Sequence, residues 1–367
     1  MVGDVLSFAM GITCLTVGAD WLVRGSSRLA TNLGVSHLVI GLTVVAFGTS
    51  APELVVSGSA ALAGEPDVAT GNVMGSTVAN VGLIVGVGAI LRPIVVHRSL
   101  LVRETPLVIG VLTLVMLLSL DDVLGRGDGI VLVLGFLLYM IFLLKWGGAG
   151  LDELAKEVEG EVGFGPAVEG VEGPGPVPAG QGVAAAGLPG AVPPPVGLHG
   201  PPGRVRKVLR VFALGPERGT GTSWAVLQVV VGLPALLLGA HWLIGSALSL
   251  AEAFQVPDAV IAATMIAVGT SLPELASTVA AAVRGLGDIA IGNVIGSNVF
   301  NLGLVLGTAS ILEPLHLPPD LIISQVLPAL IFSAALIPLA LSKERVARAE
   351  GAFLLAAYIG FVVLILR

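Results

Sequence analysis

Long apolar stretches alternate with short polar ones along almost the whole chain. Ten of the apolar stretches are each roughly 17–28 residues long, enough for an α-helix to cross the ~30 Å hydrocarbon core of a bilayer. The pattern therefore predicts an all-α polytopic membrane protein with ten transmembrane helices. We place these helices at 3–24, 36–63, 68–91, 104–120, 129–146, 223–247, 257–284, 289–312, 321–341 and 350–366.

Composition supports the membrane assignment and excludes several other classes. Hydrophobic residues make up 55% of the 367 positions and charged residues 12%, against about 25% charged residues in an average soluble domain. A net charge of -7 offers no basic surface for a nucleic acid. The single cysteine, Cys14, cannot form an internal disulfide. The expected surroundings are a lipid bilayer, with no nucleic-acid partner.

One central segment differs from the rest in composition. Residues 147–221 contain 19 Gly and 11 Pro. Such a segment cannot bury enough apolar surface to offset the entropy lost on ordering. We therefore predict a disordered linker over 147–222, between a first domain at 1–146 and a second at 223–367.

The distribution of positive charge predicts the topology. If the N-terminus lies outside, 16 of the 18 Lys and Arg residues fall in inside loops, and only Arg126 and Arg367 remain outside. Lys and Arg favour cytoplasmic loops. The chain is thus expected to be a multi-pass protein of the cell (inner or plasma) membrane. Both termini would lie outside, and the linker would be cytoplasmic.

The two domains contain related segments. Residues 41–93 match residues 262–314 without a gap at 26 of 53 positions. The strongest shared blocks are Gly-Thr-Ser-x-Pro-Glu, at 48–53 and 269–274, and Gly-Asn-x-x-Gly-Ser-x-x-x-Asn, at 71–80 and 292–301. Five predicted helices separate the copies, so the second copy would cross the membrane in the opposite direction. Inverted repeats with interrupted helices are typical of secondary transporters, whose site lies near the midplane.

An acidic residue lies deep in an apolar stretch of each copy. Glu53 and Glu274 would each cost at least ~2.5–3.5 kcal/mol at the centre of a bilayer. They could be structural carboxyls that are protonated or capped. The matched polar contexts favour a cation site instead. Pro52 and Pro273 precede the glutamates and remove a helical N–H, so each helix should break beside its glutamate and leave carbonyl oxygens free.

Hydroxyl and amide groups surround these acids in both copies. They supply hard oxygen ligands, which suit Ca²⁺ or Na⁺ better than soft metals. The first asparagine of each copy, Asn72 or Asn293, could instead only bridge helices and bind no ion. The glycines of the second block, at 71, 75, 292 and 296, should let helices approach closely. The polar residues are Thr49, Ser50, Asn72, Ser76 and Asn80 in the first copy, and Thr270, Ser271, Asn293, Ser297 and Asn301 in the second.

Charge balance indicates how such a site could work. Two carboxylates neutralise one Ca²⁺, and the same oxygens could instead hold several Na⁺ or accept protons. An empty site would leave buried charges unpaired, which disfavours an uncoupled return step. The sequence therefore predicts exchange of Ca²⁺ for Na⁺ by alternating access. Exchange of Ca²⁺ or another divalent cation for H⁺ stays open as the alternative, and a cation channel is a weaker one. The sequence shows neither a paired nucleophile nor a metal-ligating His, so nothing in it indicates an enzyme.

With both motifs present twice, the sequence resembles the calcium/cation antiporter superfamily, most closely the prokaryotic type of the sodium/calcium exchanger branch. The resemblance implies ten helices in two inverted five-helix repeats, a gating pair formed by the first and sixth helices, and no cofactor besides the transported ions. It leaves the oligomeric state open. The ion ligands it implies are Glu53, Glu274, Thr49, Ser50, Thr270, Ser271, Ser76, Ser297, Asn80 and Asn301, together with the carbonyls of Ala46 and Ala267.

The sequence also departs from two other branches of that superfamily. The potassium-dependent branch has Asp where this chain has Asn301, which argues against potassium transport. The proton-coupled branch has Glu where this chain has Gly75 and Gly296, which disfavours proton coupling. Outside these motifs, Asp20 and His241 occupy matched positions. We expect them to lie at a helix interface, with a gate as the alternative.

Overall fold

A computed structural model of the protein describes residues 2–146, 221–253, 269–341 and 344–365. Most of the predicted linker, Ala267 and the first half of the predicted helix 257–284 lie outside these residues.

The described residues before the predicted linker, called the first domain below, form helices and two short strands. Three five- or six-residue segments have π-helical hydrogen bonding and are labelled η. The elements are α1 (Val2–Leu33), α2 (His37–Ile40), η1 (Gly41–Val45), α3 (Ala46–Thr49), α4 (Ala51–Leu62), α5 (Pro66–Ala79), η2 (Asn80–Val85), α6 (Gly86–Leu91), β1 (Ile94–Val95), η3 (Leu100–Glu104), α7 (Thr105–Leu118), β2 (Val123–Leu124) and α8 (Arg126–Trp146).

The described residues after the predicted linker, called the second domain below, follow a similar order. Its elements are α11 (Thr222–Ala253), α13 (Leu272–Arg284), α14 (Gly287–Phe300), η4 (Asn301–Val305), α15 (Leu306–Leu312), β3 (Leu315–His316), α16 (Pro319–Leu321), η5 (Ile322–Val326), α17 (Leu327–Leu341), β4 (Arg345–Val346) and α18 (Arg348–Ile365).

Among the described residues, eight helices are long and apolar enough to cross a membrane, and a bent pair makes a possible ninth span. The bent pair joins His37–Thr49 to Ala51–Leu62 at 45°, within the predicted span 36–63. Only the second half of the predicted span 257–284 is described, as α13. The multi-pass helical architecture is therefore confirmed, and the count of ten helices stays a prediction.

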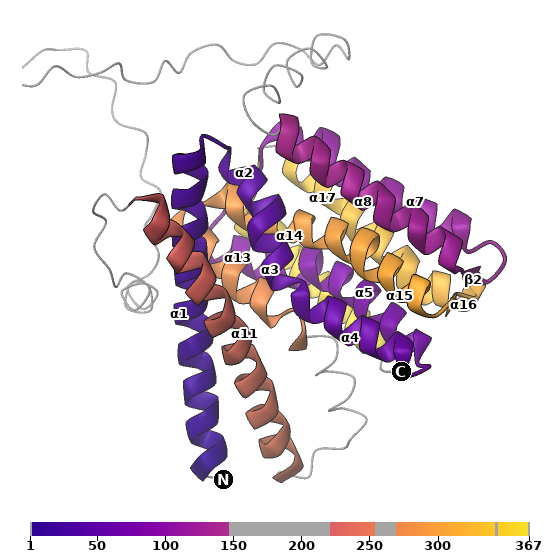
Figure 1. Ribbon diagram of the computed structural model, residues 1–367, viewed down its shortest axis with the longest axis horizontal. Coiled ribbons are helices and arrows are strands. Elements are labelled where there is room, and N and C mark those ends of the chain that lie inside the picture. The colour runs from indigo at the N-terminus through magenta and orange to yellow at the C-terminus, as the bar shows by residue number, and fades with distance from the viewer. Residues whose placement is uncertain (1, 147–220, 254–268, 342–343, 366–367) are drawn as a thin grey trace, which may run out of the picture.

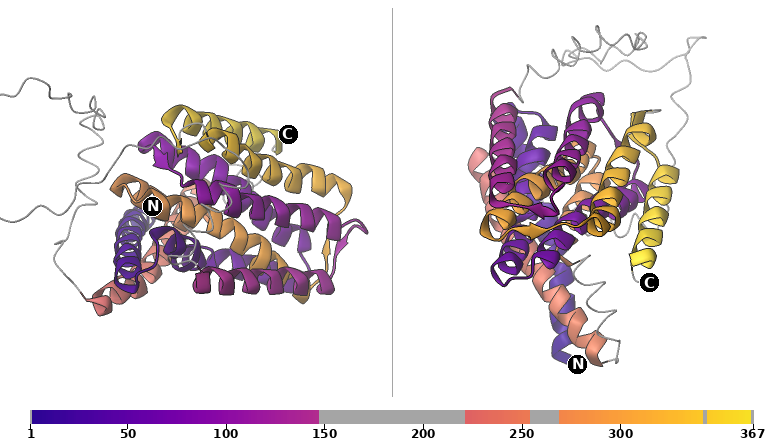
Figure 2. Two further views of the ribbon diagram at one scale, coloured as in Figure 1. Left: turned by 90° about the horizontal axis from the view of Figure 1, so that it is seen from above. Right: turned by 90° about the vertical axis from the view of Figure 1, so that its right-hand side faces the viewer.

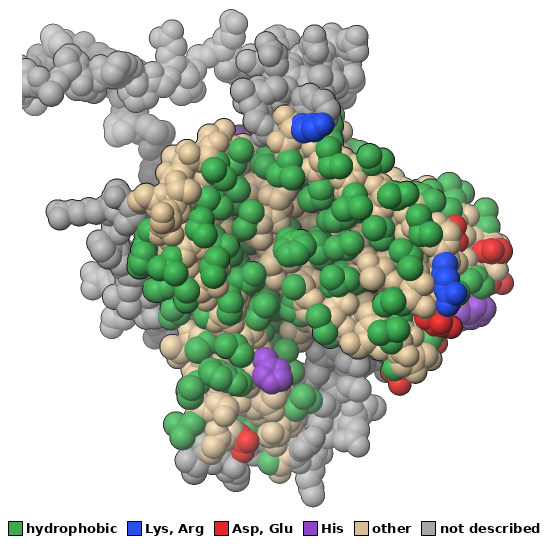
Figure 3. Space-filling model, viewed as in Figure 1, with side chains coloured by type: hydrophobic (Ala, Val, Ile, Leu, Met, Phe, Trp, Pro, Cys, Tyr) green, Lys and Arg blue, Asp and Glu red, His purple; other side chains and the backbone are tan. Residues whose placement is uncertain are grey.

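Two continuous helical spans form the centre of the molecule. In the most apolar stretches of Pro66–Leu91 and Gly287–Leu312, 78% and 94% of the residues are buried, against 17–39% in the other six spans. The outer helices expose large apolar side chains such as Leu138, Leu144 and Leu364. Figure 3 shows this broad apolar surface, with charged side chains gathered toward its right-hand end. Such a surface is suited to lipid and not to water.

The helices α1 and α11 form a closely packed pair that runs steeply across the others (Figure 1) and projects beyond them (Figure 2). Glycines allow this approach. A Cβ atom on Gly18 would lie 2.3 Å from the backbone N of Leu236, and one on the equivalent Gly239 would lie 2.2 Å from that of Leu15. The two backbones are therefore in direct contact, which only glycine permits.

Two short antiparallel ladders connect the domains. Ile94 of β1 pairs with Val346 of β4, and Val123 of β2 pairs with His316 of β3. The strand β1 lies against Gly287 at the start of α14, whereas β3 follows α15 directly. The ladders thus hold the domains together at both ends of the central span α14–α15. The sequence pattern did not predict them.

Candidate functional site

Each buried glutamate lies in the first turn of a helix that begins directly after a break. Ser50 precedes α4 with φ -87° and ψ 5°, and Ser271 precedes α13 with φ -86° and ψ 2°. Proline follows in both helices and cannot donate to the preceding turn. Glu53 is 0% exposed and Glu274 1%. The positive end of a helix dipole therefore faces each carboxylate.

Close packing brings α14 of the second domain against α2, η1 and α3 of the first. A Cβ atom on Gly296 would lie 2.7 Å from the Leu42 backbone and 2.8 Å from the Ala46 Cβ, and one on Gly292 would lie 2.9 Å from the Leu38 carbonyl oxygen. These contacts confirm that Gly292 and Gly296 let helices approach closely, as predicted. Gly71 and Gly75 would pack against the equivalent segment of the second domain. That segment lies outside the described residues, so the role of these two glycines stays a prediction.

The polar groups of the two domains meet between these helices. Ser50 Oγ donates a hydrogen bond to Glu274 Oε1 at 3.1 Å, across the domain boundary. Ser271 Oγ donates to Ser76 Oγ at 3.3 Å, and Ser76 Oγ also lies 3.5 Å from Thr270 Oγ1. The structure therefore brings together residues that the sequence placed at separate helix breaks.

Several oxygen atoms at this place are buried and have no hydrogen-bond partner among the described residues. A buried polar atom without a partner costs free energy, so an arrangement of several needs a ligand or a water to satisfy it. Carboxylate, amide and hydroxyl oxygens together form a donor set that fits a hard cation. The atoms are Glu53 Oε1 and Oε2, Glu274 Oε2, Asn80 Oδ1, Asn301 Oδ1 and Ser297 Oγ.

The electrostatics of the two glutamates differ from those of a structural ion pair. Glu53 and Glu274 are close enough to repel one another, and within the described ranges no Lys, Arg or His forms a salt bridge with either. A third buried carboxylate, Glu104, pairs with its neighbour Arg103. Two uncompensated carboxylates side by side attract positive charge, and this makes them the centre of the candidate site.

Asn72 and Asn293, which are not among the ion ligands that the resemblance implies, hold the threonines of the site. Thr49 Oγ1 donates to Asn293 Oδ1 at 3.1 Å, and Thr270 Oγ1 donates to Asn72 Oδ1 at 3.1 Å. Both asparagines thus bridge helices through these hydrogen bonds, as the alternative interpretation of the sequence proposed. Their spacing within one helix could not reveal that each bond reaches a residue of the other domain.

The second asparagines of the motifs begin the π-helical segments η2 and η4, a feature frequent at functional sites. Asn80 Nδ2 donates to Asn298 Oδ1 at 2.8 Å. Thr77 is the residue of the first domain that is equivalent to Asn298, and it donates instead to Val73 O of its own helix. Asn301 consequently has no such partner among the described residues, and the two halves of the site are not identical.

Of the two carbonyl ligands expected from the resemblance, only that of Ala46 can be located. Ala46 O lies in α3, accepts from the backbone N–H of Ser50 at 3.0 Å and lies 3.4 Å from Thr49 Oγ1. Ala267 lies outside the described residues. In the described part of the chain, no group of three or more His, Cys, Asp or Glu side chains could hold a metal ion.

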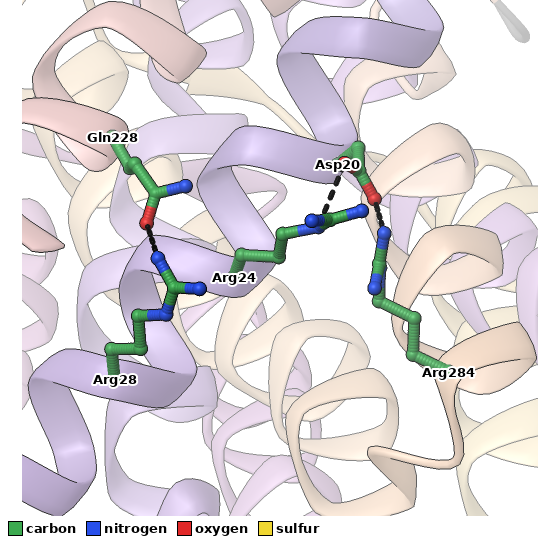
Figure 4. Close-up of polar contacts among 5 residues, drawn as sticks. All are labelled: Asp20, Arg24, Arg28, Gln228 and Arg284. Carbon is green, nitrogen blue, oxygen red and sulfur yellow. Dashed lines mark hydrogen bonds and ion pairs between the residues drawn. The ribbon is translucent and has the colours of Figure 1, made fainter. Parts of the chain in front are cut away.

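A second polar cluster joins α1 to α13 at a distance from this site along the chain. The buried Asp20 pairs with Arg24 Nε at 2.9 Å and with Arg284, the last residue of α13. Arg28 Nη1 donates to Gln228 Oε1 of α11 at 2.8 Å. Figure 4 shows Asp20 between the two arginines. Asp20 therefore lies at a helix interface, as expected.

A family model described as "Sodium/calcium exchanger protein" matches residues 4–145 and 224–367.

The chain belongs to the sodium/calcium exchanger family.

Similar proteins cover almost the full length of the chain. A protein named putative antiporter CaxA, from Alkalimonas amylolytica, is 34% identical over 96% of this chain and 95% of its own. The sodium/calcium exchanger MaX1 from Methanosarcina acetivorans is 32% identical over 99% of this chain and 98% of its own. These relatives are transporters and not enzymes.

Solved structures of the sodium-calcium exchanger NCX_Mj have the same fold. One of them superimposes with a TM-score of 0.74 at 28% identity and covers 99% of this chain and 98% of that one. Membership of the exchanger family and this structural match together support transport of cations, including Ca²⁺, by antiport.

Proposed function

We propose that this protein exchanges Ca²⁺ for Na⁺ across the cell membrane, at a site built around Glu53 and Glu274. One observation carries the proposal: two equivalent, fully buried carboxylates meet between the domains, and among the described residues their oxygens are largely free and no cationic side chain pairs with them. The names of MaX1 and NCX_Mj, both sodium/calcium exchangers, support the choice of ions.

The ion ligands in this proposal are ten of the twelve polar residues of the two motifs, without Asn72 and Asn293, and two backbone carbonyls. Glu53 and Glu274 supply the charge, and the neutral oxygens complete a shell of hard ligands. No other cofactor is needed for transport. The neutral ligands are Thr49, Ser50, Ser76, Asn80, Thr270, Ser271, Ser297 and Asn301, with the carbonyls of Ala46 and Ala267.

Charge compensation explains why such a site couples two fluxes. One Ca²⁺ or two Na⁺ would neutralise the glutamate pair. Without an ion, two like charges would stay buried in the bilayer, at a cost of at least ~2.5–3.5 kcal/mol each on insertion scales. The loaded protein therefore changes conformation more readily than the empty one. This difference enforces exchange and prevents leak.

The architecture proposed for this mechanism has ten transmembrane helices in two inverted five-helix repeats, at 1–146 and 223–367, with the linker 147–222 between them. The nearly equal backbone angles at Ser50 and Ser271 and the matched contacts of Gly18 and Gly239 support the repeat. One repeat moving against the other would expose the site to each side in turn.

The proposed topology has both termini outside and the linker in the cytoplasm. Arg24 and Arg284 were both assigned to the inside from the positive charge of the loops. Their shared contact with Asp20 supports a position on the same side of the membrane.

Uptake of radioactive Ca²⁺ into proteoliposomes tests the function. The vesicles are loaded with Na⁺, K⁺ or choline, with and without a pH gradient. We expect uptake only with internal Na⁺. Uptake driven by the pH gradient without Na⁺ would replace the proposal with Ca²⁺/H⁺ exchange, in which the same two glutamates would carry protons. Uptake without any counter-ion would indicate a channel instead.

A further inference from the structure

We infer that Asn72 and Asn293 are positioning residues, which orient the Thr270 and Thr49 hydroxyls so that each threonine turns its oxygen lone pairs toward the transported cation. The inference rests on the proposed function, because it assumes that these threonines contact the ion. It assigns a role to two side chains that do not themselves serve as ligands.

The first pair shows how the orientation is fixed. The hydroxyl of Thr49 donates to Asn293 Oδ1 at 3.1 Å. The other end of the same amide is fully used, because Asn293 Nδ2 lies 3.0 Å from both Ser277 Oγ and Thr278 Oγ1. Asn293 is 0% exposed. Ser277 Oγ uses its own proton on the Glu274 carbonyl oxygen at 3.1 Å, so it can only accept from the amide. The Asn293 oxygen therefore stays directed at Thr49.

The second pair repeats this arrangement with the domains exchanged. The hydroxyl of Thr270 donates to Asn72 Oδ1 at 3.1 Å, and Asn72 Nδ2 donates to Ser57 Oγ at 2.9 Å. Asn72 is 3% exposed. A shift of 221 residues relates three members of one arrangement to the other: Thr49 to Thr270, Asn72 to Asn293 and Ser57 to Thr278. The additional partner Ser277 has no such counterpart, because Val56 stands at the equivalent position. Two independent occurrences make an incidental contact a poor explanation.

The chemical consequence follows from the single proton of a hydroxyl group. A threonine hydroxyl can donate one hydrogen bond and has two acceptor lone pairs. When the proton points to the asparagine oxygen, it does not point at the cation, and a lone pair is left to face the ion. Without the asparagine, the hydroxyl could rotate its proton toward Glu53 or Glu274. It would then compete with the cation for the carboxylate.

A direct role of the asparagines as ligands fits the structure less well. In Asn293 the oxygen and the nitrogen both have protein partners, and the same holds for Asn72. By contrast, the oxygens of Asn80 and Asn301 have no partner among the described residues. The first and second asparagines of each motif therefore have different tasks: one orients a neighbour and the other offers its oxygen.

Double-mutant cycles on Ca²⁺ affinity test the inference. The Ca²⁺ Kd is measured by titration calorimetry on the purified full-length protein for Asn72→Ala, Thr270→Val and the double variant. One hydrogen bond to a ligand group contributes up to about 1.5 kcal/mol, or about tenfold in affinity. We expect each single variant to weaken Ca²⁺ binding by up to about tenfold, and the double variant to be no weaker than Thr270→Val.

A cross cycle separates positioning from a general structural effect. Asn72→Ala and Thr49→Val belong to different arrangements, so their effects on the Kd should multiply. Thr77→Val is the matched control, because this buried threonine on the same helix donates only to Val73 O. It should leave the Kd unchanged. Asn72→Leu, which keeps more of the volume, replaces Asn72→Ala if the smaller residue does not yield folded protein.

The outcomes distinguish this inference from the proposed function. If Asn72→Ala weakens binding further in the Thr270→Val background, or has no effect alone, the inference is wrong even when Na⁺-driven Ca²⁺ uptake is intact. If the wild type binds Ca²⁺ without Na⁺-driven uptake, the proposed exchange is wrong, while the cycle on the Kd still decides the inference. A wild type that does not bind Ca²⁺ overturns both.

Discussion

Glu274→Gln provides the sharpest test of the site, because it removes one charge and little else. Glutamine has nearly the same volume as glutamate, and its Oε1 can still accept the hydrogen bond from Ser50 Oγ, which is 3.1 Å long in the wild type. Glu274 is 1% exposed and forms no salt bridge with a described residue. The loss of its charge is therefore not masked by solvent or by a neighbouring cation.

The size of the effect can be bounded from the buried position. A unit charge and a divalent ion 4 Å apart attract one another by about 8 kcal/mol at an effective dielectric constant of about 20. The glutamine oxygen remains a ligand, so the real loss is smaller. Truncating one member of a buried charge pair costs about 2–5 kcal/mol. We therefore expect the Ca²⁺ Kd to rise by about 30- to 5,000-fold.

The same substitution should stabilise the protein when no ion is bound. It removes one of two buried charges, each worth at least ~2.5–3.5 kcal/mol on insertion scales. In the wild type, Ca²⁺ at 100 times its Kd should add about 2.7 kcal/mol of stability. The variant at the same concentration should gain almost none. The expected pattern is a higher Tm without ions and a much smaller shift of Tm with Ca²⁺.

Two assays measure these effects together. Thermal unfolding in detergent, with and without Ca²⁺, reports the stability, and Ca²⁺ uptake into Na⁺-loaded proteoliposomes reports transport. Glu53→Gln should behave in the same way because Glu53 is equally buried. Glu104→Gln is the matched control, since Glu104 pairs with Arg103, and it should keep its Ca²⁺-dependent shift of Tm. Wild-type uptake and a wild-type shift in Glu274→Gln would refute the assignment of the site.

Two further substitutions test the packing around the site. Gly18→Ala should separate α1 from α11 and lower the Tm, because its Cβ would lie 2.3 Å from Leu236 N. Gly135→Ala is the control and should leave the Tm unchanged, because no atom lies within 4 Å of its Cβ. Equal melting temperatures for the two variants would contradict the packing argument. Asp20→Asn should lower the stability by about 3 kcal/mol, because it breaks the buried ion pair with Arg284. An unchanged unfolding midpoint in denaturant would show that this pair does not join α1 to α13.

The sequence alone determined the membrane class, most of the helix spans and the two helix breaks. These features depend on local composition: long apolar runs can only be buried in a bilayer, and proline removes a helical donor wherever it stands. The repeat of both motifs also identified Glu53 and Glu274 as a matched pair. The structure places both residues in the first turn after a break.

The tertiary structure decided how the two copies meet. Spacing within a helix places Asn72, Ser76 and Asn80 on one face, but it does not say what lies opposite. The bond from Thr49 to Asn293 joins residues 244 positions apart, and the bond from Thr270 to Asn72 joins residues 198 positions apart. The two ladders between the domains and the Asp20 cluster likewise join residues that lie far apart in the sequence. All depend on the relative position of packed helices, and no local pattern in the chain determines that position.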